Sequence, residues 1–153
     1  MIYYNAKDIA KFFLSKESMT HKKLQKLVYY AYSWVLIFHN NKEEKKIENK
    51  LFKSRIEAWT HGPVIPELYQ EYKEFGWSLI PKINNFSFEE NHPDVIKLLE
   101  KVYKTYKKYD ADELEAMTHL ETPWKKGQTY TGKVMTDEDI FEYFFNLQYG
   151  QKA

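Results

Sequence analysis

The sequence predicts a mainly α, compact single-domain bundle of about six helices, with a small β-hairpin near residues 47–59. Three observations predict this class. Apolar residues recur at helical spacing along most of the chain, capping residues precede several of these segments, and 153 residues are the length of one domain. Because there is no internal repeat, linker or low-complexity tract, we expect residues 1–153 to form one domain.

The first two helices are expected after Asn5 and after Thr20, whose side chains can cap the free amides of a first helical turn. The second segment should run to about His39. Its apolar side chains cover nearly all of its faces, which is typical of the central helix of a bundle.

The predicted hairpin follows. Two apolar pieces, residues 51–52 and 56–59, are too brief for helices. Residues 61–63, His-Gly-Pro, then break the chain, and Pro66 suits the first turn of a helix that ends at Gly76. We expect residues 77–91 to form a loop.

Three more helices complete the predicted bundle. One begins at Pro93, and a short one is capped by Asp110 and ended by residues 122–124, Thr-Pro-Trp. The last is capped by Thr136.

Charge and composition exclude several classes of protein. Twenty-three basic and 22 acidic side chains leave a formal charge of +1, so no global field draws the protein to nucleic acid or anionic lipid. The absence of cysteine excludes disulfides and thiolate metal sites and fits a reducing compartment. The N-terminus does not resemble a signal peptide and no apolar run could span a membrane, so the cytoplasm is the expected location.

The one candidate for catalysis or metal binding is the set Glu57, His61, His119 and Glu121, because paired imidazoles and carboxylates can hold zinc or transfer protons. Histidines near turns and helix ends also serve as hydrogen-bonding groups, and we favour that structural role. We therefore predict no enzyme activity, no cofactor and no metal. A hydrolase-like or metal site using His61 and His119 is the alternative.

Two charged helix faces could bind partners. The helix after Pro93 carries a row of lysines with tyrosines between them, a pattern that could bind nucleic acid. The row is Lys97, Lys101, Lys104 and Lys108, and the tyrosines are Tyr103, Tyr106 and Tyr109. We favour a solvated face, so nucleic acid is not the expected partner and a nucleic-acid-binding regulator is a further alternative.

The helix after Pro66 carries Glu67, Glu71 and Glu74 at spacings of four and three. Such a row is usually a solvent-exposed face. It becomes a candidate binding face if the partner is basic, because clustered charges of one sign attract a partner of opposite charge during encounter.

Four blocks resemble motifs of the Panacea-domain proteins, a family of SocA-like and GepA-like antitoxins, many of them phage-associated. The blocks are residues 20–31 with Trp34; residues 57–69 with Tyr72, Phe75 and Gly76; Leu114, Thr118, His119, Glu121 and 123–125; and Asp139, Ile140, Tyr143 and Phe144. The core Trp-x-x-Gly-Pro-Val-x-Pro, residues 59–66, is the most specific element.

The resemblance implies an antitoxin of a toxin–antitoxin or prophage-defence locus, which neutralises a cognate protein toxin encoded in the adjacent gene by direct binding. An adaptor that delivers a bound protein to an ATP-dependent protease is the alternative. The motif positions are expected to be mostly structural: Lys23, Leu24, Gln25, Lys26, Leu27, Tyr30, Trp34, Trp59, His61, Gly62, Pro63, Val64, Pro66, Tyr69, His119, Glu121, Pro123 and Trp124. The toxin-binding candidates are Glu67, Glu71, Glu74 and Tyr72.

Overall fold

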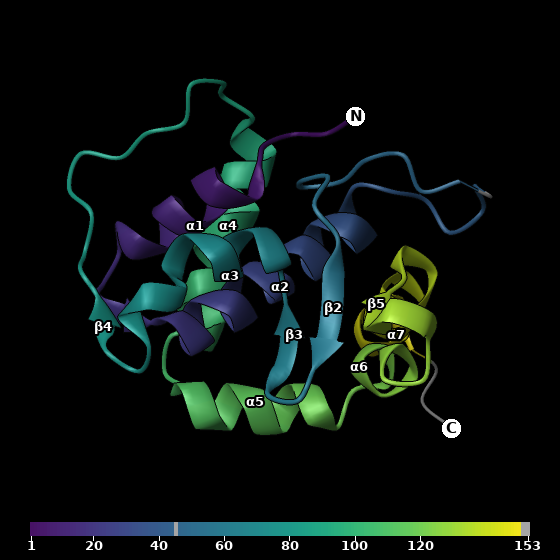
Figure 1. Ribbon diagram of the computed structural model, residues 1–153. Helices are drawn as coiled ribbons and strands as arrows, with labels where there is room; N and C mark the ends of the chain where they lie inside the picture. The colour runs from purple at the N-terminus through teal and green to yellow at the C-terminus, as the bar shows by residue number, and fades with distance from the viewer. Residues whose placement is uncertain (45, 151–153) are drawn as a thin grey trace.

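A computed structural model describes residues 1–44 and 46–150. Position 45 and residues 151–153, which the expected domain 1–153 includes, lie outside the described residues. Within the described residues the chain forms seven α-helices, two 3-10 turns and five short strands (Figure 1). The mainly α class is therefore confirmed.

The short strands lie between helices along the chain. The helices are α1 (Ala6–Leu14), α2 (His21–Phe38), α3 (Pro66–Tyr72), α4 (Pro93–Tyr106), α5 (Ala111–His119), α6 (Thr122–Gly127) and α7 (Asp137–Tyr149). The 3-10 turns are η1 (Lys73–Phe75) and η2 (Thr131–Lys133). The strands are β1 (Met19–Thr20), β2 (Ile56–Trp59), β3 (Gly62–Val64), β4 (Leu79–Ile80) and β5 (Val134–Met135).

The predicted helix caps are confirmed. The Asn5 side chain accepts a hydrogen bond from the Asp8 amide, and Thr20 accepts one from the Lys23 amide. Asp110 forms a complete capping box at the start of α5, and Thr136 caps α7. Local sequence therefore fixes where these four helices begin.

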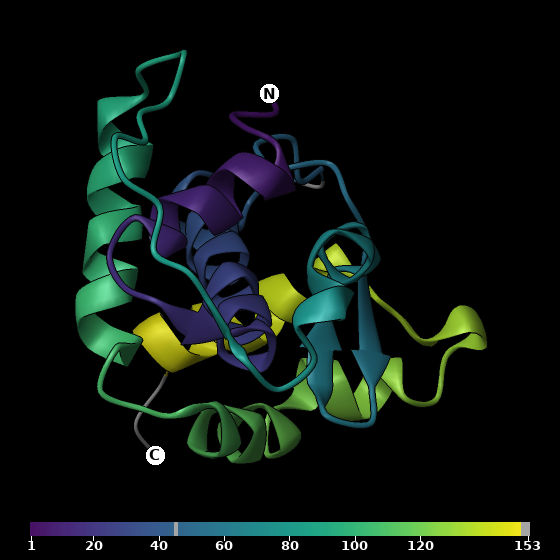
Figure 2. The same ribbon diagram turned by 60° about the vertical axis from the view of Figure 1, so that its left-hand side comes forward.

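Helix α2 is the centre of the molecule. It packs against α1, α4, α5 and α7 and against strand β3. In Figure 2 it lies between α4 on one side and the β2–β3 hairpin on the other. Apolar side chains on nearly all of its faces are buried, as expected for a central helix. Among the described residues, none of the helices combines the length and the apolar character needed to cross a membrane.

The β-hairpin lies further along the chain than the prediction placed it. Strand β2 pairs with β3, with Trp59 opposite Gly62, and β5 adds to the other edge of β2. Residues 51–52 are buried, but they do not pair with β2. Instead, the Tyr4 amide donates to the Leu51 carbonyl at 2.9 Å, so this segment lies beside the N-terminus.

Two further boundaries differ from the prediction. Residues 122–124 begin a helix, α6, instead of only ending α5, because Pro123 stands in its first turn, where its missing amide costs nothing. The expected loop 77–91 contains strand β4, which pairs with β1 through Ile80 opposite Met19.

Two polar side chains of α2 fix the hairpin to the helix. The Gln25 amide accepts from the Ile65 N–H at 2.8 Å and donates to the Ile65 carbonyl at 3.2 Å, as a neighbouring strand would. The Lys26 ammonium donates to the Pro63 carbonyl at 3.1 Å and is 1% exposed. Lys26 therefore pairs the outward carbonyl of β3, and Gln25 pairs both backbone groups of the residue that follows the strand.

A buried carboxyl group lies among the aromatic rings on the other side of α2. Tyr30 stacks on Tyr106 at 4.2 Å, and its hydroxyl donates to Glu121 at 2.7 Å. The second carboxyl oxygen of Glu121 and the hydroxyl of Tyr29 are buried without a hydrogen-bond partner among the described residues. Burial raises the pKa of Glu121 to about 7, although the Tyr30 hydrogen bond opposes the shift.

We expect Gly62→Ala to destabilise the fold by about 3 kcal/mol, through a positive φ and overpacking. Gly62 has φ of 107°, and an added Cβ would stand 2.8 Å from Lys26 Cε and 2.9 Å from Thr118 Oγ1. Gly76→Ala is the control, because Gly76 also has positive φ but nothing within 4 Å of the added Cβ. Urea unfolding measures both, and an equal effect of the two substitutions would contradict the crowding at Lys26.

We expect Glu121→Gln to stabilise the protein at pH 8 by up to about 3 kcal/mol and to have little effect at pH 4. The pKa of Glu121 is raised in the folded state, so the wild-type protein is penalised as pH rises from about 4.5 to 7 and the carboxyl ionises. Glutamine removes that penalty and can still accept from Tyr30. Unfolding across pH measures the difference, with the exposed Glu142→Gln as control. A pH-independent difference between the two proteins would show that Glu121 does not ionise in this range.

Candidate functional site

Most motif residues lie in or against the hairpin, whereas Tyr30, Trp34 and Glu121 lie in the aromatic core on the other side of α2. The buried motif residues are Leu24, Gln25, Lys26, Leu27, Tyr30, Gly62, Pro63, Val64, Glu121 and Pro123. The partly exposed ones are Lys23, Trp34, Trp59, Pro66, His119 and Trp124, and the exposed ones are His61 and Tyr69. Three segments that are distant in sequence, in α2, in the hairpin and in α5–α6, thus lie together.

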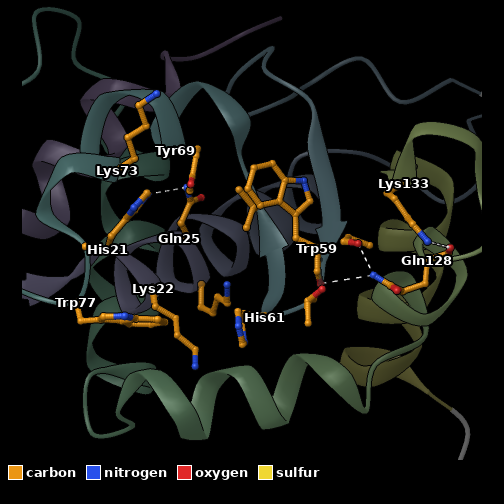
Figure 3. Close-up of a pocket in the computed structure, with 15 residues that line it drawn as sticks. His21, Lys22, Gln25, Trp59, His61, Tyr69, Lys73, Trp77, Gln128 and Lys133 are labelled. Carbon is orange, nitrogen blue, oxygen red and sulfur yellow. Dashed lines mark hydrogen bonds between the residues drawn. The ribbon is translucent and has the colours of Figure 1, made fainter.

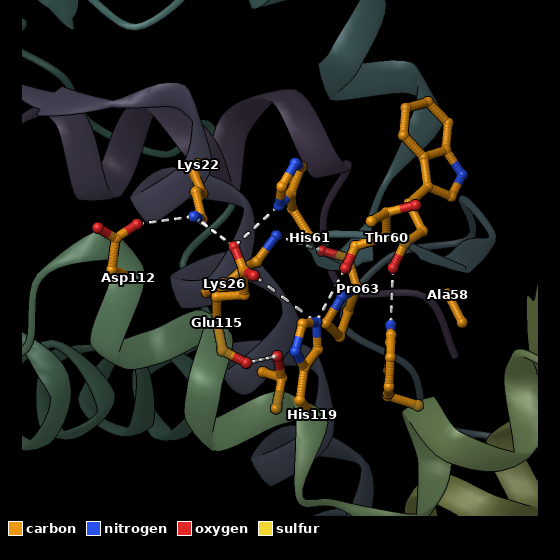
Figure 4. Close-up of polar contacts among 12 residues, drawn as sticks. Lys22, Lys26, Ala58, Thr60, His61, Pro63, Asp112, Glu115 and His119 are labelled. Atoms are coloured by element: carbon orange, nitrogen blue, oxygen red, sulfur yellow. Dashed lines mark hydrogen bonds and ion pairs between the residues drawn. The ribbon is translucent and has the colours of Figure 1, made fainter.

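Side chains of α5 and α6 hold the strand β2 side of the hairpin. The His119 ring lies 3.0 Å from the Thr60 carbonyl (Figure 4), and the Trp124 indole N–H donates to the Trp59 carbonyl at 2.8 Å. His119 also stacks on Trp124 at 4.1 Å. These groups therefore bind backbone and hold the scaffold together.

Glu115 is the polar centre that sequence reasoning missed. Its carboxylate pairs with Lys22, lies 3.1 Å from His61 Nδ1 and 3.9 Å from His119 Nε2 (Figure 4). Partial burial opposes ionisation, but Lys22 and His61 outweigh it and lower the pKa of Glu115. Its position four residues before His119 on one helix was the available signal.

The predicted set Glu57, His61, His119 and Glu121 is not assembled as one site. Glu57 accepts from the Trp59 indole at 2.8 Å and pairs with Arg55, while Glu121 lies in the aromatic core with Tyr30. In residues 1–44 and 46–150, no three histidine or carboxylate side chains are grouped so as to hold a metal ion. The two histidines share Glu115 instead.

The lysine row of α4 is exposed, but its tyrosines are engaged in the fold. The Tyr103 hydroxyl donates to Glu17 at 2.8 Å, and the buried Tyr106 accepts from the Trp34 indole at 2.9 Å. Lys108 lies 5.2 Å above the ring of Tyr109. Tyr103 and Tyr106 are therefore not free to stack on bases, which nucleic-acid binding through this row would need.

The carboxylates of α3 are exposed, as a binding face requires. Two of them have partners in the chain: Ser54 donates to Glu67 at 2.6 Å, and Lys7 lies 3.6 Å from Glu71. Tyr72 is only 8% exposed, so little of its side chain is accessible, and its role as a toxin-binding residue stays a prediction. Its ring faces inward toward His21, at 5.9 Å.

A groove of about 810 Å³ crosses the hairpin between α3 and α6. Its lining consists of His21, Lys22, Gln25, Lys26, Ala58, Trp59, Thr60, His61, Val64, Tyr69, Lys73, Gly76, Trp77, Gln128 and Lys133 (Figure 3). A volume of this size is in the range of ligand-binding clefts.

Burial keeps the floor of the groove weakly charged. It lowers the pKa of Lys26 to about 7, with a further contribution from Lys22, and lowers the pKa of His21 to about 4, with one from Lys26. The Lys22 ammonium is paired with Asp112 and Glu115. The groove therefore has a polar but largely compensated floor.

The edge of the groove is apolar and exposed. We use the name lip for Trp77, which lines the groove, together with Phe75 in η1 and Leu79 in β4, which flank it in the sequence. Trp77 is 77% exposed and Leu79 is 61% exposed. Gly76, with φ of 55°, turns the chain between Phe75 and Trp77. Three large apolar side chains within five residues are typical of a surface that a partner covers.

Of three comparisons with known proteins, one found a match. No curated protein and no solved structure matches the chain. The family model for antitoxin SocA-like proteins with a Panacea domain matches residues 24–125. The match contains the α2 motif from Leu24 onward, the hairpin core and the α5–α6 motif, whereas the fourth block, in α7, lies outside it. The chain therefore belongs to the SocA-like antitoxin family and carries its Panacea domain.

Proposed function

We propose that this protein neutralises a cognate protein toxin, encoded in the adjacent gene, by direct protein–protein contact. Membership of the SocA-like family supports an antitoxin role in general and a toxin as partner. The observation that carries the direct contact is the lip, because an indole that is 77% exposed beside a groove resembles the aromatic anchors of binding interfaces.

The hydrogen bonds that the motif side chains form within the fold favour a protein-binding role over catalysis. Gln25, Lys26, His119 and Trp124 each form a hydrogen bond to a backbone group of the hairpin or of its junction with α3. A side chain committed to the scaffold is poorly placed to act on a substrate. Of the residues that suggested chemistry, His119 therefore has a structural explanation.

Binding to the toxin should survive purification. Co-expression of this chain with the toxin should restore growth, and a tagged toxin should retain the chain, because interfaces of standard size give stable complexes. Growth assays and pull-down measure this. Restored growth with toxin levels that fall only when an ATP-dependent protease is present would support the adaptor alternative. Neither rescue nor a complex would contradict the proposal.

We expect the acidic residues Glu67 and Glu71 of α3 to attract a basic region of the toxin during encounter. Reversing Glu67 and Glu71 to Lys should slow association by about tenfold at low salt and narrow the range of toxins neutralised, because charge pairing affects encounter and selectivity more than affinity. Stopped-flow association over a salt series measures the effect.

The matched control for that experiment reverses Glu89 and Glu142, two exposed carboxylates away from α3, to Lys. This control changes the net charge by the same amount as the reversal of Glu67 and Glu71. If both pairs slow association to the same extent, the effect belongs to net charge and the α3 row has no specific part in it.

A further inference from the structure

The groove is elongated. Figure 3 shows Lys73 and Trp77 on one side of it, Gln128 and Lys133 on the other, and Trp59 between them. The two sides belong to different parts of the chain, the turn after α3 and the segment from α6 to η2. An extended chain of several residues fits this outline better than a compact ligand does.

The ends of the groove are positively charged. No aspartate or glutamate is among its lining residues. Lys73 and Lys133 are exposed, and the hydrogen bonds of their ammonium groups go to neutral oxygens, at 3.0 Å to the Gln70 side chain and 2.7 Å to the Gln128 carbonyl. Neither ion-pairs with a described carboxylate. These two charges are available to an anionic partner, whereas that of Lys22 is already compensated.

The middle of the groove is aromatic. Trp59 and Tyr69 meet edge to face at 4.9 Å, and Tyr69 lies 5.7 Å from His21. The exposed ring of Trp77 stands 6.4 Å from that of His61 at the rim. Such rings provide large contact areas at little conformational cost, and they suit an apolar side chain of the occupant.

The occupant does not add a strand to the hairpin. The Ile65 backbone is paired with Gln25, the Pro63 carbonyl accepts from Lys26, and proline has no amide to donate. Recognition must therefore come from side chains, which makes it dependent on the sequence of the occupant.

We infer that this groove binds an extended acidic segment of the toxin, with a large apolar side chain against Trp59 and carboxylates near Lys73 and Lys133. The inference rests on the proposed function, which supplies the toxin as partner. The charge complementarity of the groove ends selects an acidic segment, and the lip covers its apolar side chain.

The first test measures the affinity of the purified toxin for groove variants. Trp77→Ala and the double substitution Lys73→Glu/Lys133→Glu should each weaken binding at least tenfold, by isothermal titration calorimetry. The matched controls are Leu120→Ala, an apolar residue 76% exposed outside the groove, and Lys97→Glu/Lys101→Glu on α4. These controls should bind within twofold of the wild-type protein. All substituted positions are exposed, so folding should be retained, which circular dichroism checks.

The second test identifies the segment without assuming that the toxin binds. A display library of random 12-residue peptides is selected on the wild-type protein. Selected peptides should be acidic with a central aromatic or large aliphatic residue, and should lose at least tenfold in affinity to the two groove variants. Changing their acidic residues to lysine should restore binding to Lys73→Glu/Lys133→Glu, as charge complementarity demands.

The outcomes separate the two proposals. A toxin complex that is unaffected by the groove variants would overturn the groove assignment and leave the antitoxin role intact. No toxin complex, together with acidic peptides that need Trp77 and the two lysines, would support the groove and contradict the proposed function. Selected peptides without acidic residues, or peptides that bind all groove variants equally, would overturn the acidic-segment inference.

Discussion

The attachment of the hairpin to α2 by Gln25 and Lys26 is the constraint on which the rest of the structure depends. The hairpin is short and β5 pairs with only two residues of β2, so this small sheet has little stability of its own. It is held because a helix side chain supplies the hydrogen bonds that a further strand would otherwise provide. The floor of the groove, the position of Trp59 and the start of α3 all follow from that attachment.

Lys26 makes this attachment specific at an energetic cost. Removing an ammonium group from water is unfavourable, which is why burial lowers its pKa to about 7. The structure offsets the cost with one hydrogen bond to Pro63 and with the nearby Glu115 carboxylate. The space that Lys26 fills lies directly against Gly62, so the two motifs fit only as a pair. An apolar side chain in place of Lys26 would fill the space but would not bind the Pro63 carbonyl. The register of α2 against the hairpin would then be less defined.

Local patterns in the sequence predicted the helices well, because caps such as Asn5 and Thr20 act within one turn. The predicted position of the hairpin was too early in the chain, for two reasons. Gly62, with φ of 107°, lets the chain reverse where a break was expected, and Pro63 is tolerated in an edge strand. The pairing of residues 50–51 with the N-terminus is a long-range contact that no local pattern shows. Glu115 had one local signal, its spacing of four residues from His119, but its contacts with Lys22 and His61 come from other elements and could not be read from the sequence.

The structure divides the chain into a scaffold and a contact surface. The motif side chains use their polar groups on one another and on the backbone, and so define the groove without filling it. Of the residues proposed to meet a partner, Trp59 is a motif position, whereas Lys73, Trp77 and Lys133 are outside the motif and their side chains contribute little to the core. Substitutions there can change the charge and shape of the groove at small cost in stability, because exposed positions tolerate change. A fold arranged in this way can retain one scaffold while its contact surface is adapted to different toxins.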